Sequence, residues 1–393
     1  MTAHHVERDG STQAASPGAA PRIALACVGI GRFQRGFERY FTDLFGVLRD
    51  SLDITLYKSA GATGPREKIP PMLALLTGLA RRLPLGKVGT EYPQYKHDCL
   101  AFGVGMLPDL LRGRYDVVHV IDPPLVKVLQ FLQRITGFRA RLIWTDGCLW
   151  PPSLYPRNAH VHHVAQELYM DALSAGVPPS RVTLAPCGIH VERFATGPTR
   201  HDLRRKHGIA EATFVIAVVS AVRRDHKRVD HIIEEVAALE GDILLWIDGK
   251  PEDPYIPELA ERRLGNRCRI TFVASEQVGE IYQVADVFVH AALEESFGLA
   301  VVEALSTGVP VLVHDSRHFE WLVGERECLV DMRAPGVLRS RLAGLVANHG
   351  SAAGHSQARA AGVRSRFDWT AVQPRYLEMY RRAASKSSIE EPS

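Results

Sequence analysis

Two carboxylates flank a bare glycine in the segment ESFGLAVVE, where Glu295 precedes and Glu303 follows Phe297, Gly298 and Leu299. The amides at a helix entry have no partner within the helix, and the helix dipole is positive there, so Gly298 and Leu299 predict an anion site. Glycine also lets a phosphate approach the backbone closely. A carboxylate repels phosphate but accepts hydrogen bonds from a diol, so this pair predicts a sugar and a ribose flanking a diphosphate.

The same spacing also has a purely structural interpretation, in which Glu295 caps the helix and Glu303 is a solvated helix residue. A second group of charges favours the ligand interpretation. Arg223, Arg224 and Lys227 lie in RRDHK, after the apolar run FVIAVVSA. Cations in the loop after a strand would neutralise a leaving diphosphate. A solvated basic loop would have the same composition.

Short runs rich in Val and Ile alternate with segments of helical length, which is typical of parallel sheets covered on both faces. The runs are residues 22–29, 53–58, 116–122, 141–146, 160–165 and 181–188, followed by 214–221, 242–249, 269–274, 287–291 and 310–315. The 393 residues, 46% of them hydrophobic, can build two cores. We therefore predict the α/β class, with two Rossmann-like doubly wound domains and a ligand cleft between them.

Composition excludes several classes of protein. The net charge of +3 gives no general attraction for nucleic acid, so no nucleic-acid partner is expected. The six cysteines are scattered singly, which indicates reduced thiols in a cytoplasmic protein. Residues 1–20 lack an apolar signal core and are expected to form a disordered tail. No run of about 18 apolar residues is present, so we expect no membrane span.

These motifs resemble the retaining GT-B glycosyltransferases of the glycosyltransferase family 4 (glycosyl transferases group 1) type. The block from Glu295 to Glu303, followed by ALSTGVPVLV, is similar to that family's E-G-F-G-L-x-x-x-E-A…G-x-P-V signature. PCGIHVERF at 186–194 is similar to its interdomain P-N-G-I-D-x-x-x-F segment, and HKRVDHIIEEV to its K-G-x-D-x-L-I-x-A motif. GRFQRGFERYFTDLFGVL at 31–48 resembles its glycine-rich acceptor-side loop. The similarity covers nearly the whole chain.

The resemblance implies a division of labour between two domains. Residues 21–188 would form the acceptor-side domain, joined by a C-terminal helix at 367–385, and residues 189–366 would bind the nucleotide-sugar. The implied reaction moves a hexose from a nucleotide-sugar donor to a hydroxyl acceptor by a front-face mechanism that retains the anomeric configuration. A UDP-sugar is the favoured donor and GDP-mannose the alternative. The acceptor could be a small molecule, a glycan or a lipid-linked compound.

The resemblance also implies roles for individual residues. The catalytic group would be Glu295, Lys227, Arg223 and Asp146; the donor-binding group Glu303, Gly298, Leu299, Phe297 and Arg224; the acceptor-side group Gly31, Gly36 and Glu38. Either Arg223 or Arg224 would be the second phosphate cation. Asp146 ends IWTD where many members carry a histidine, although it could instead cap a helix before GCLWPPS. No D-x-D occurs, so no metal site and no cofactor are expected.

Other functions remain open on the sequence. GIGRFQRG, with Gly29, Gly31 and Gly36, approaches the dinucleotide motif of oxidoreductases, but its third glycine comes two positions late. A non-catalytic nucleotide-sugar-binding protein or a GT-B sugar-nucleotide epimerase would share the donor motifs. His160 and His162 fall on one face of a strand, as in some zinc sites, without an evident third ligand.

The segment 66–99 is longer than an ordinary crossover between strands. It carries an apolar stripe beside cations: Met72, Leu73, Leu75, Leu76 and Leu79 with Lys68, Arg81, Arg82 and Lys87. Such a stripe suits weak peripheral contact with the inner face of a membrane, or a lipid-linked acceptor. An ordinary core helix with a solvated end explains the same residues.

Overall fold

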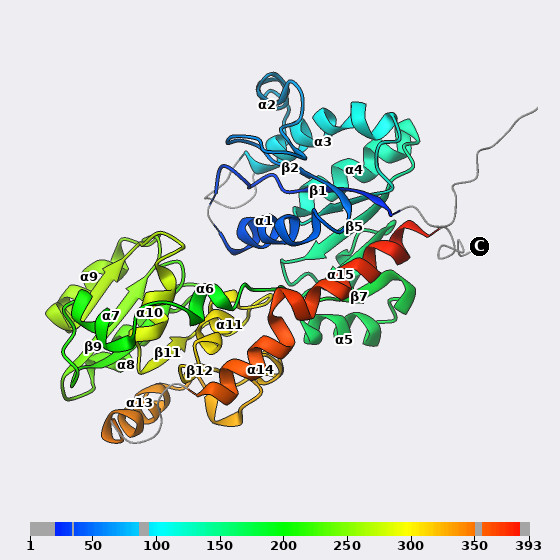
Figure 1. The fold of residues 1–393 in the computed structure, drawn as a ribbon. Coiled ribbons are helices and arrows are strands. Elements are labelled where there is room, and N and C mark those ends of the chain that lie inside the picture. Colours follow the sequence, from blue (N-terminus) through cyan, green and yellow to red (C-terminus); the bar gives the residue numbers. More distant parts are fainter. Residues whose placement is uncertain (1–19, 34, 86–93, 350–355, 386–393) are drawn as a thin grey trace, which may run out of the picture.

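Two α/β domains stand next to each other in the computed structural model, which describes residues 20–33, 35–85, 94–349 and 356–385 (Figure 1). Each contains one parallel sheet with helices packed on its two faces. The predicted tail at 1–20 falls almost entirely outside the described residues, as do residues 86–93 of the segment 66–99. Among the described helices, none combines the length and the apolar character that crossing a bilayer requires.

The N-terminal domain holds a sheet of seven strands in the order β3-β2-β1-β4-β5-β6-β7. The strands are β1 (Arg22–Ala26), β2 (Asp53–Tyr57), β3 (Glu67–Lys68), β4 (Val117–Val120), β5 (Arg141–Asp146), β6 (Ala159–His163) and β7 (Val182–Leu184). The helices are α1 (Gly36–Leu48), α2 (Leu73–Ala80), α3 (Tyr95–Leu111), α4 (Pro123–Thr136) and α5 (Gln166–Ser174). All four residues of β4 are buried, as expected for a strand covered on both faces.

The C-terminal domain holds a sheet of six strands in the order β10-β9-β8-β11-β12-β13. The strands are β8 (Phe214–Val219), β9 (Ile243–Asp248), β10 (Cys268–Thr271), β11 (Val287–His290), β12 (Val311–His314) and β13 (Leu329–Val330). The helices are α6 (Glu192–Ala195), α7 (Arg200–Lys206), α8 (Val229–Ala237), α9 (Tyr255–Leu264), α10 (Val278–Val284), α11 (Leu299–Ser306), α12 (Arg317–Val323), α13 (Val337–Ala347) and α14 (Gln357–Phe367).

The strand orders confirm the predicted pair of doubly wound domains. In each sheet the order reverses once, between β1 and β4 in the first domain and between β8 and β11 in the second. Ligands of open α/β sheets bind outside the carboxyl ends of the strands at such switch points. All eleven predicted runs form strands. The sequence missed β3 and β13, because two residues are too few to produce an alternating or apolar pattern.

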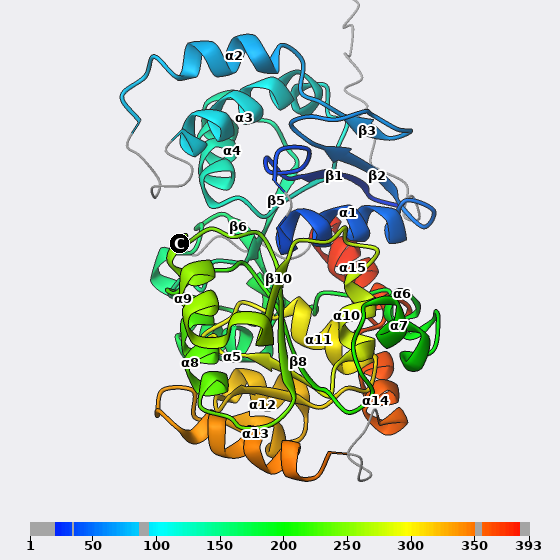
Figure 2. The same cartoon turned by 90° about the vertical axis from the view of Figure 1, so that its left-hand side faces the viewer.

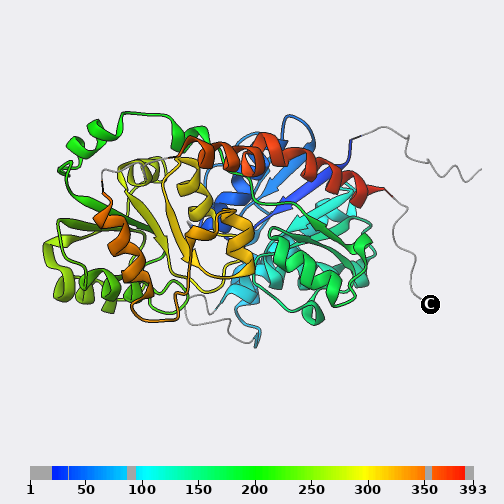
Figure 3. The ribbon, with the colours of Figure 1, turned by 90° about the horizontal axis from the view of Figure 1, so that it is seen from below.

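The last helix, α15 (Trp369–Ala384), returns to the N-terminal domain and contacts α1, β4 and β5 (Figure 3). The crossing point is held by the side chain of Asp368, which accepts a hydrogen bond of 2.9 Å from the amide of Thr370. Tyr376 donates its hydroxyl to the carbonyl of Pro186 at 2.8 Å, and the Tyr380 hydroxyl bonds His119 Nδ1 at 2.7 Å. The aromatic side chains of this helix, Trp369, Tyr376 and Tyr380, are therefore buried against the first domain.

The two domains share a continuous apolar core. Helix α1 lies on the side of the first domain that faces the second (Figure 2). One cluster of buried side chains runs from Phe41 of α1 through Trp369 of α15 to Ile281 and Val302 of the second domain. This shared core places α1 and the N-terminus of α11 against each other.

Candidate functional site

Lys227 and Glu295 form an ion pair across the switch point of the C-terminal sheet. Lys227 lies in the loop after β8, and Glu295 lies in the loop after the neighbouring strand β11. His290, the last residue of β11, places Nε2 at 3.0 Å from the same Oε1 atom of Glu295. The side chains of Lys227 and Glu295 are only 19% and 9% exposed, so the pair is largely shielded from solvent.

The surroundings keep Glu295 charged. Burial would raise the pKa of this carboxyl, but the hydrogen bond from His290 and the charge of Lys227 outweigh burial and lower it below its usual value. Burial lowers the pKa of His290, so its imidazole is neutral near pH 7 and donates Nε2–H to the carboxylate. The second oxygen of Glu295 can therefore accept hydrogen bonds from ligand hydroxyls.

Helix α11 begins where the motif predicts, at Leu299, with Gly298 as its N-cap. Gly298 has φ 93°, in the left-handed region, and a Cβ there would lie 3.2 Å from Leu322 Cδ2. Because other residues would be strained in this conformation, glycine is required. The first amides of α11 point out of the helix, with no side chain capping them.

Phe297 supports this helix entry from behind. Its ring is 2% exposed and packs edge-on against the rings of Trp321 and Phe367. Its carbonyl bonds His318 Nε2 at 2.9 Å. The side chain of Phe297 therefore packs in the core and does not face the donor site as predicted.

Glu303, on α11, is 3% exposed, which excludes the alternative that it is a solvated helix residue. Tyr282 of α10 donates to its Oε2 atom at 2.9 Å. Arg39 of α1, in the other domain, bonds its Oε1 atom at 2.9 Å. Burial raises the pKa of Glu303, against the opposing influence of Arg39 and of the Tyr282 hydrogen bond.

The two candidate arginines in the loop after β8 bond different carboxylates. Arg223 forms a bidentate pair with Asp225, at 2.5 and 2.6 Å, and also reaches Glu252 at 3.1 Å. Arg224 is half exposed, bonds Asp253 at 2.6 Å and stacks over a tyrosine ring. Both line a pocket of about 500 Å³ with these carboxylates. Their existing partners mean that a phosphate would have to compete for either guanidinium.

The glycine-rich loop of the first domain faces this site. Gly36 opens α1, and a Cβ on it would lie 3.5 Å from Leu299 Cδ1, so the two helix entries meet across the domains. Gly31 has φ 85°, and a Cβ there would lie 2.2 Å from the carbonyl oxygen of Ala60. Gly31 therefore allows a close approach of backbone that a side chain would prevent, whereas a side chain at Gly36 would make only an ordinary contact with Leu299.

Glu38 braces the same loop from inside. It is 5% exposed and accepts hydrogen bonds of 2.5 and 3.2 Å from Arg35. A Cβ on Gly29 would lie 1.9 Å from Glu38 Oε1, so the carboxylate covers the first glycine of the loop. Glu38 therefore stabilises the conformation of this loop. It also disfavours the dinucleotide interpretation of GIGRFQRG, because a carboxylate over that glycine would repel a pyrophosphate.

Asp146 ends β5 as a fully buried residue. Its Oδ1 atom accepts hydrogen bonds from the amides of Cys148 and Trp150 at 3.3 and 3.4 Å. Burial raises its pKa to about 6. The geometry disfavours sugar contact, because the carboxylate is turned toward the amides of its own loop. The helix-capping alternative is wrong, because the next helical turn, residues 152–154, begins later and has Pro151 as its N-cap.

Three residues of the site were missed by the motif analysis: His290, Tyr282 and Arg39. The position of His290 at the end of a strand, five residues before Glu295, was a usable signal. Tyr282 gave none, because its hydroxyl meets Glu303 only after α10 packs against α11.

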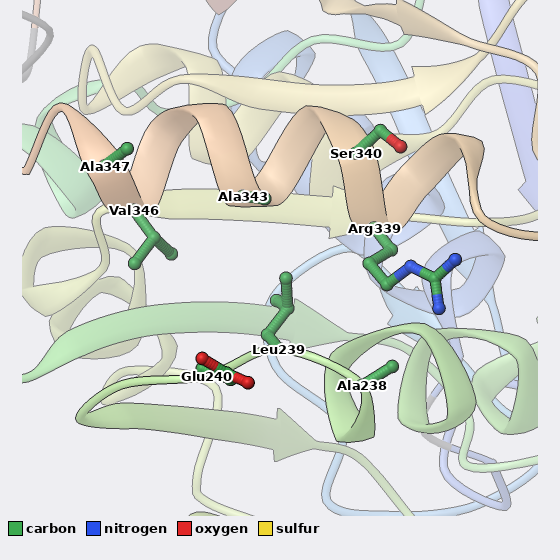
Figure 4. A pocket seen from close by; sticks show the side chains of 8 residues that line it. All are labelled: Ala238, Leu239, Glu240, Arg339, Ser340, Ala343, Val346 and Ala347. Carbon is green, nitrogen blue, oxygen red and sulfur yellow. The ribbon is translucent and has the colours of Figure 1, made fainter.

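Within the described residues, no three His, Cys, Asp or Glu side chains gather as a metal site. His160 bonds Thr183, and His162 bonds Thr145 and the carbonyl of Ala185, as polar residues of a packed sheet do. A second pocket, of about 390 Å³, lies between α13 and the end of α8 (Figure 4). It is at the amino ends of the strands, whereas Lys227 is at their carboxyl ends.

Comparison with known proteins identifies the domain that carries Lys227 and both glutamates. Residues 199–352 match the family model described as glycosyl transferases group 1. The C-terminal domain is thus similar to the glycosyl transferases group 1 family over these residues. A curated relative is the alpha-monoglucosyldiacylglycerol synthase of Acholeplasma laidlawii, 26% identical over 43% of this chain and 45% of the relative. The chain spans about half the length of the curated relatives it matches.

Solved structures extend the similarity to both domains. Sucrose-phosphate synthase from Thermosynechococcus elongatus superposes with a TM-score of 0.76 over 93% of this chain and all of that one, at 17% identity. Anabaena HepE in complex with UDP and glucose gives 0.70 over 92% of this chain and 99% of that one, at 19% identity. At these identities the likeness establishes the fold. The fold of this chain is GT-B, as the resemblance implied.

Proposed function

We propose that this chain is a retaining glycosyltransferase that moves a hexose from a nucleotide-sugar to a hydroxyl acceptor. The observation that carries the proposal is the arrangement around α11. A charged Glu295 paired with Lys227 and a buried Glu303 stand on either side of a helix entry whose amides are free of side-chain caps. This arrangement offers a diphosphate site between two diol sites.

The proposed reaction is a front-face displacement. The bond between the anomeric carbon and the diphosphate oxygen breaks, and the acceptor hydroxyl attacks from the same face, so the configuration is retained. The acceptor proton passes to the departing phosphate oxygen. Lys227, the first amides of α11 and one of the arginines Arg223 and Arg224 stabilise the charge that develops on the diphosphate.

The two glutamates hold the two sugars. Glu295 accepts hydrogen bonds from donor-sugar hydroxyls through the oxygen that faces away from Lys227. Glu303 holds the ribose. Neither role needs a metal ion, and we propose that the transfer is metal-independent. Asp146 and Glu38 shape the acceptor-side loops, Gly31 lets its loop pack against the carbonyl of Ala60, and Gly36 faces the acceptor at the start of α1.

A UDP-sugar is the proposed donor, with GDP-mannose as the alternative. Support comes from the structural neighbour HepE, which was solved with UDP and glucose. The base and the sugar epimer are read by loop positions that differ among proteins of one fold.

We further propose that the acceptor is presented at a membrane surface through α2. Leu75 and Leu79 of α2 are 54% and 49% exposed, and Met72, the N-cap of α2, is 65% exposed, so the apolar face that they form is open to solvent. The exposed Arg81 and Arg82 follow at the end of the helix. An exposed apolar face beside cations fits the interface of an anionic bilayer. The relative from Acholeplasma laidlawii is named for a diacylglycerol product, which is consistent with a lipid acceptor.

The test begins with calorimetric titration of a panel of UDP-, GDP- and ADP-sugars, followed by NMR analysis of the product formed with candidate acceptors. We expect binding of one donor class, retention of the anomeric configuration and full activity in EDTA. Inversion of configuration, or loss of activity on chelation, would contradict the mechanism. Binding without transfer or hydrolysis would instead identify a non-catalytic binder, and release of a free epimer would identify an epimerase.

A further inference from the structure

Arg39 crosses from the N-terminal domain into the proposed ribose site of the other domain. It lies on the second turn of α1 and bonds Glu303 Oε1 at 2.9 Å, while its guanidinium also lies 5.6 Å from the centre of the Phe194 ring. Its side chain is 26% exposed and that of Glu303 only 5%. Charge-assisted bonds in such shielded places are among the strong interactions of a protein.

The other charged groups around Glu303 are few. Asp43, one turn along α1, lies 3.8 Å from Arg39 and 3.9 Å from Arg193, a residue of α6. Tyr282 approaches Glu303 from α10 as a neutral donor. Asp43 raises and Arg193 lowers the pKa of Glu303, but Arg39 is the cation in direct contact with it.

The bonds to Arg39 and Tyr282 leave room for a ligand. An ionised carboxylate has roughly four acceptor sites, and these two residues use one on each oxygen. Each oxygen can therefore accept one more hydrogen bond, which matches the two hydroxyls of a ribose. A protonated Glu303 would lose one of these acceptors, and a buried carboxyl without a cation favours protonation.

We propose that Arg39 is a positioning residue that holds Glu303 as an oriented carboxylate for the ribose of a nucleoside diphosphate. The inference rests on the proposed function of Glu303. Because Arg39 belongs to the acceptor-side domain, the donor site is complete only when the two domains touch at α1 and α11. Contact between the domains is thereby coupled to nucleotide binding by one guanidinium.

The chain offers a matched control for this contact. Arg317 of α12 also crosses between the domains, where it bonds Glu167 of α5 at 3.0 Å and Asp171 at 3.4 Å. Neither carboxylate is part of the proposed donor site. R317Q therefore removes an interdomain ion pair that does not involve Glu303, whereas R39Q removes the ion pair of Glu303 itself.

The experiment measures UDP affinity of the full chain by calorimetry for wild type, R39Q, R39K, E303Q, R39Q/E303Q and R317Q. We expect R39Q to bind UDP at least about tenfold more weakly near neutral pH, because a bond to a charged group is lost. R39K should retain part of the affinity, and R317Q should match wild type. Raising the pH should restore binding to R39Q but not to E303Q, since only R39Q regains a carboxylate.

The double variant provides the decisive comparison. If Arg39 acts through Glu303, R39Q should cause no further loss in the E303Q background. An equal loss in R317Q, a full additional loss in the double variant or an unchanged R39Q would overturn this inference alone. Failure of the wild type to bind UDP, GDP or ADP would overturn the proposed function as well. Melting temperatures of all variants show that each is folded.

Discussion

Replacing Lys227 with methionine should separate the structural from the ligand-binding contribution of the switch-point ion pair. Methionine preserves the length and most of the volume of the side chain but removes its charge. Glu295, which is only 9% exposed, would then keep a single donor, the neutral His290. The substitution thus leaves a shielded carboxylate without its cation.

The expected cost follows from this geometry. Removing one partner of a buried ion pair typically destabilises a protein by about 3–5 kcal/mol. Because both side chains are less than one-third exposed and His290 remains as a donor, we expect about 3 kcal/mol, the lower end of that range. For a domain of this size, that loss lowers the melting temperature by about 6–12 °C. Adding E295Q to K227M removes the uncompensated charge and should restore most of the loss.

The stability that this ion pair contributes depends on pH. The folded-state pKa of Glu295 lies below its value of about 4.3 in an unfolded chain. The stability from its ionisation is therefore present above about pH 4.3 and is lost as the pH falls further. The difference in melting temperature between wild type and K227M should accordingly be largest above about pH 4.3 and shrink as the pH is lowered from there to about pH 3.

The assay is thermal denaturation of wild type, K227M, E295Q and the double variant, followed by calorimetric titration with UDP. K227M should also bind UDP about tenfold more weakly or worse, and E295Q should not repair that defect, because the phosphate has lost its cation. If K227M kept both its melting temperature and its UDP affinity, the assignment of this ion pair to the donor site would be wrong.

Three further predictions concern other parts of the chain. Truncation before Phe367 should lower the melting temperature clearly, because α15 packs on the first domain. Removing the first 18 residues should leave the melting temperature unchanged, and thermal denaturation of both truncated chains tests this. Burial lowers the pKa of His162 to about 3 and that of His119 below its usual value, so both imidazoles are neutral in the folded state. Because they gain protons only in the unfolded chain, the free energy of unfolding should fall as the pH drops below about 6.5. The loss of melting temperature between about pH 7 and pH 5 should be smaller in H162Q than in wild type. Replacing Arg81 and Arg82 with serine should reduce co-sedimentation with anionic liposomes, or change acceptor kinetics, without changing UDP affinity; unchanged values in both assays would favour a small soluble acceptor.

The fold could be predicted because its signals are local. Most of the long strands are runs rich in apolar and β-branched residues, and the alternation with helical segments implies parallel sheets. The start of α11 could also be predicted, since Gly298 followed by an apolar helical segment marks a helix start without side-chain capping. The pairing of Lys227 with Glu295 follows from the same logic, because loops after neighbouring strands meet at one sheet edge.

The directions of several side chains depended on packing. Phe297, Glu38 and Asp146 stand within motifs that suggest ligand contact, yet each is turned into the protein by its neighbours. The exposed face of α2 is the opposite case, because Leu75 and Leu79 follow a helical spacing that usually marks core. A periodic pattern predicts that one face of a helix is apolar, but it does not reveal whether another element covers that face.

The sequence by itself determined the two doubly wound domains and the residues of the donor motif, because propensity, hydrophobic period and helix capping act over a few neighbouring positions. The contact of Arg39 with Glu303 was decided only by the tertiary structure. The two residues come from different domains, and their distance depends on how α15 and the shared core bring α1 against α11. No local pattern encodes that arrangement, because it results from the summed packing of surfaces far apart in the chain.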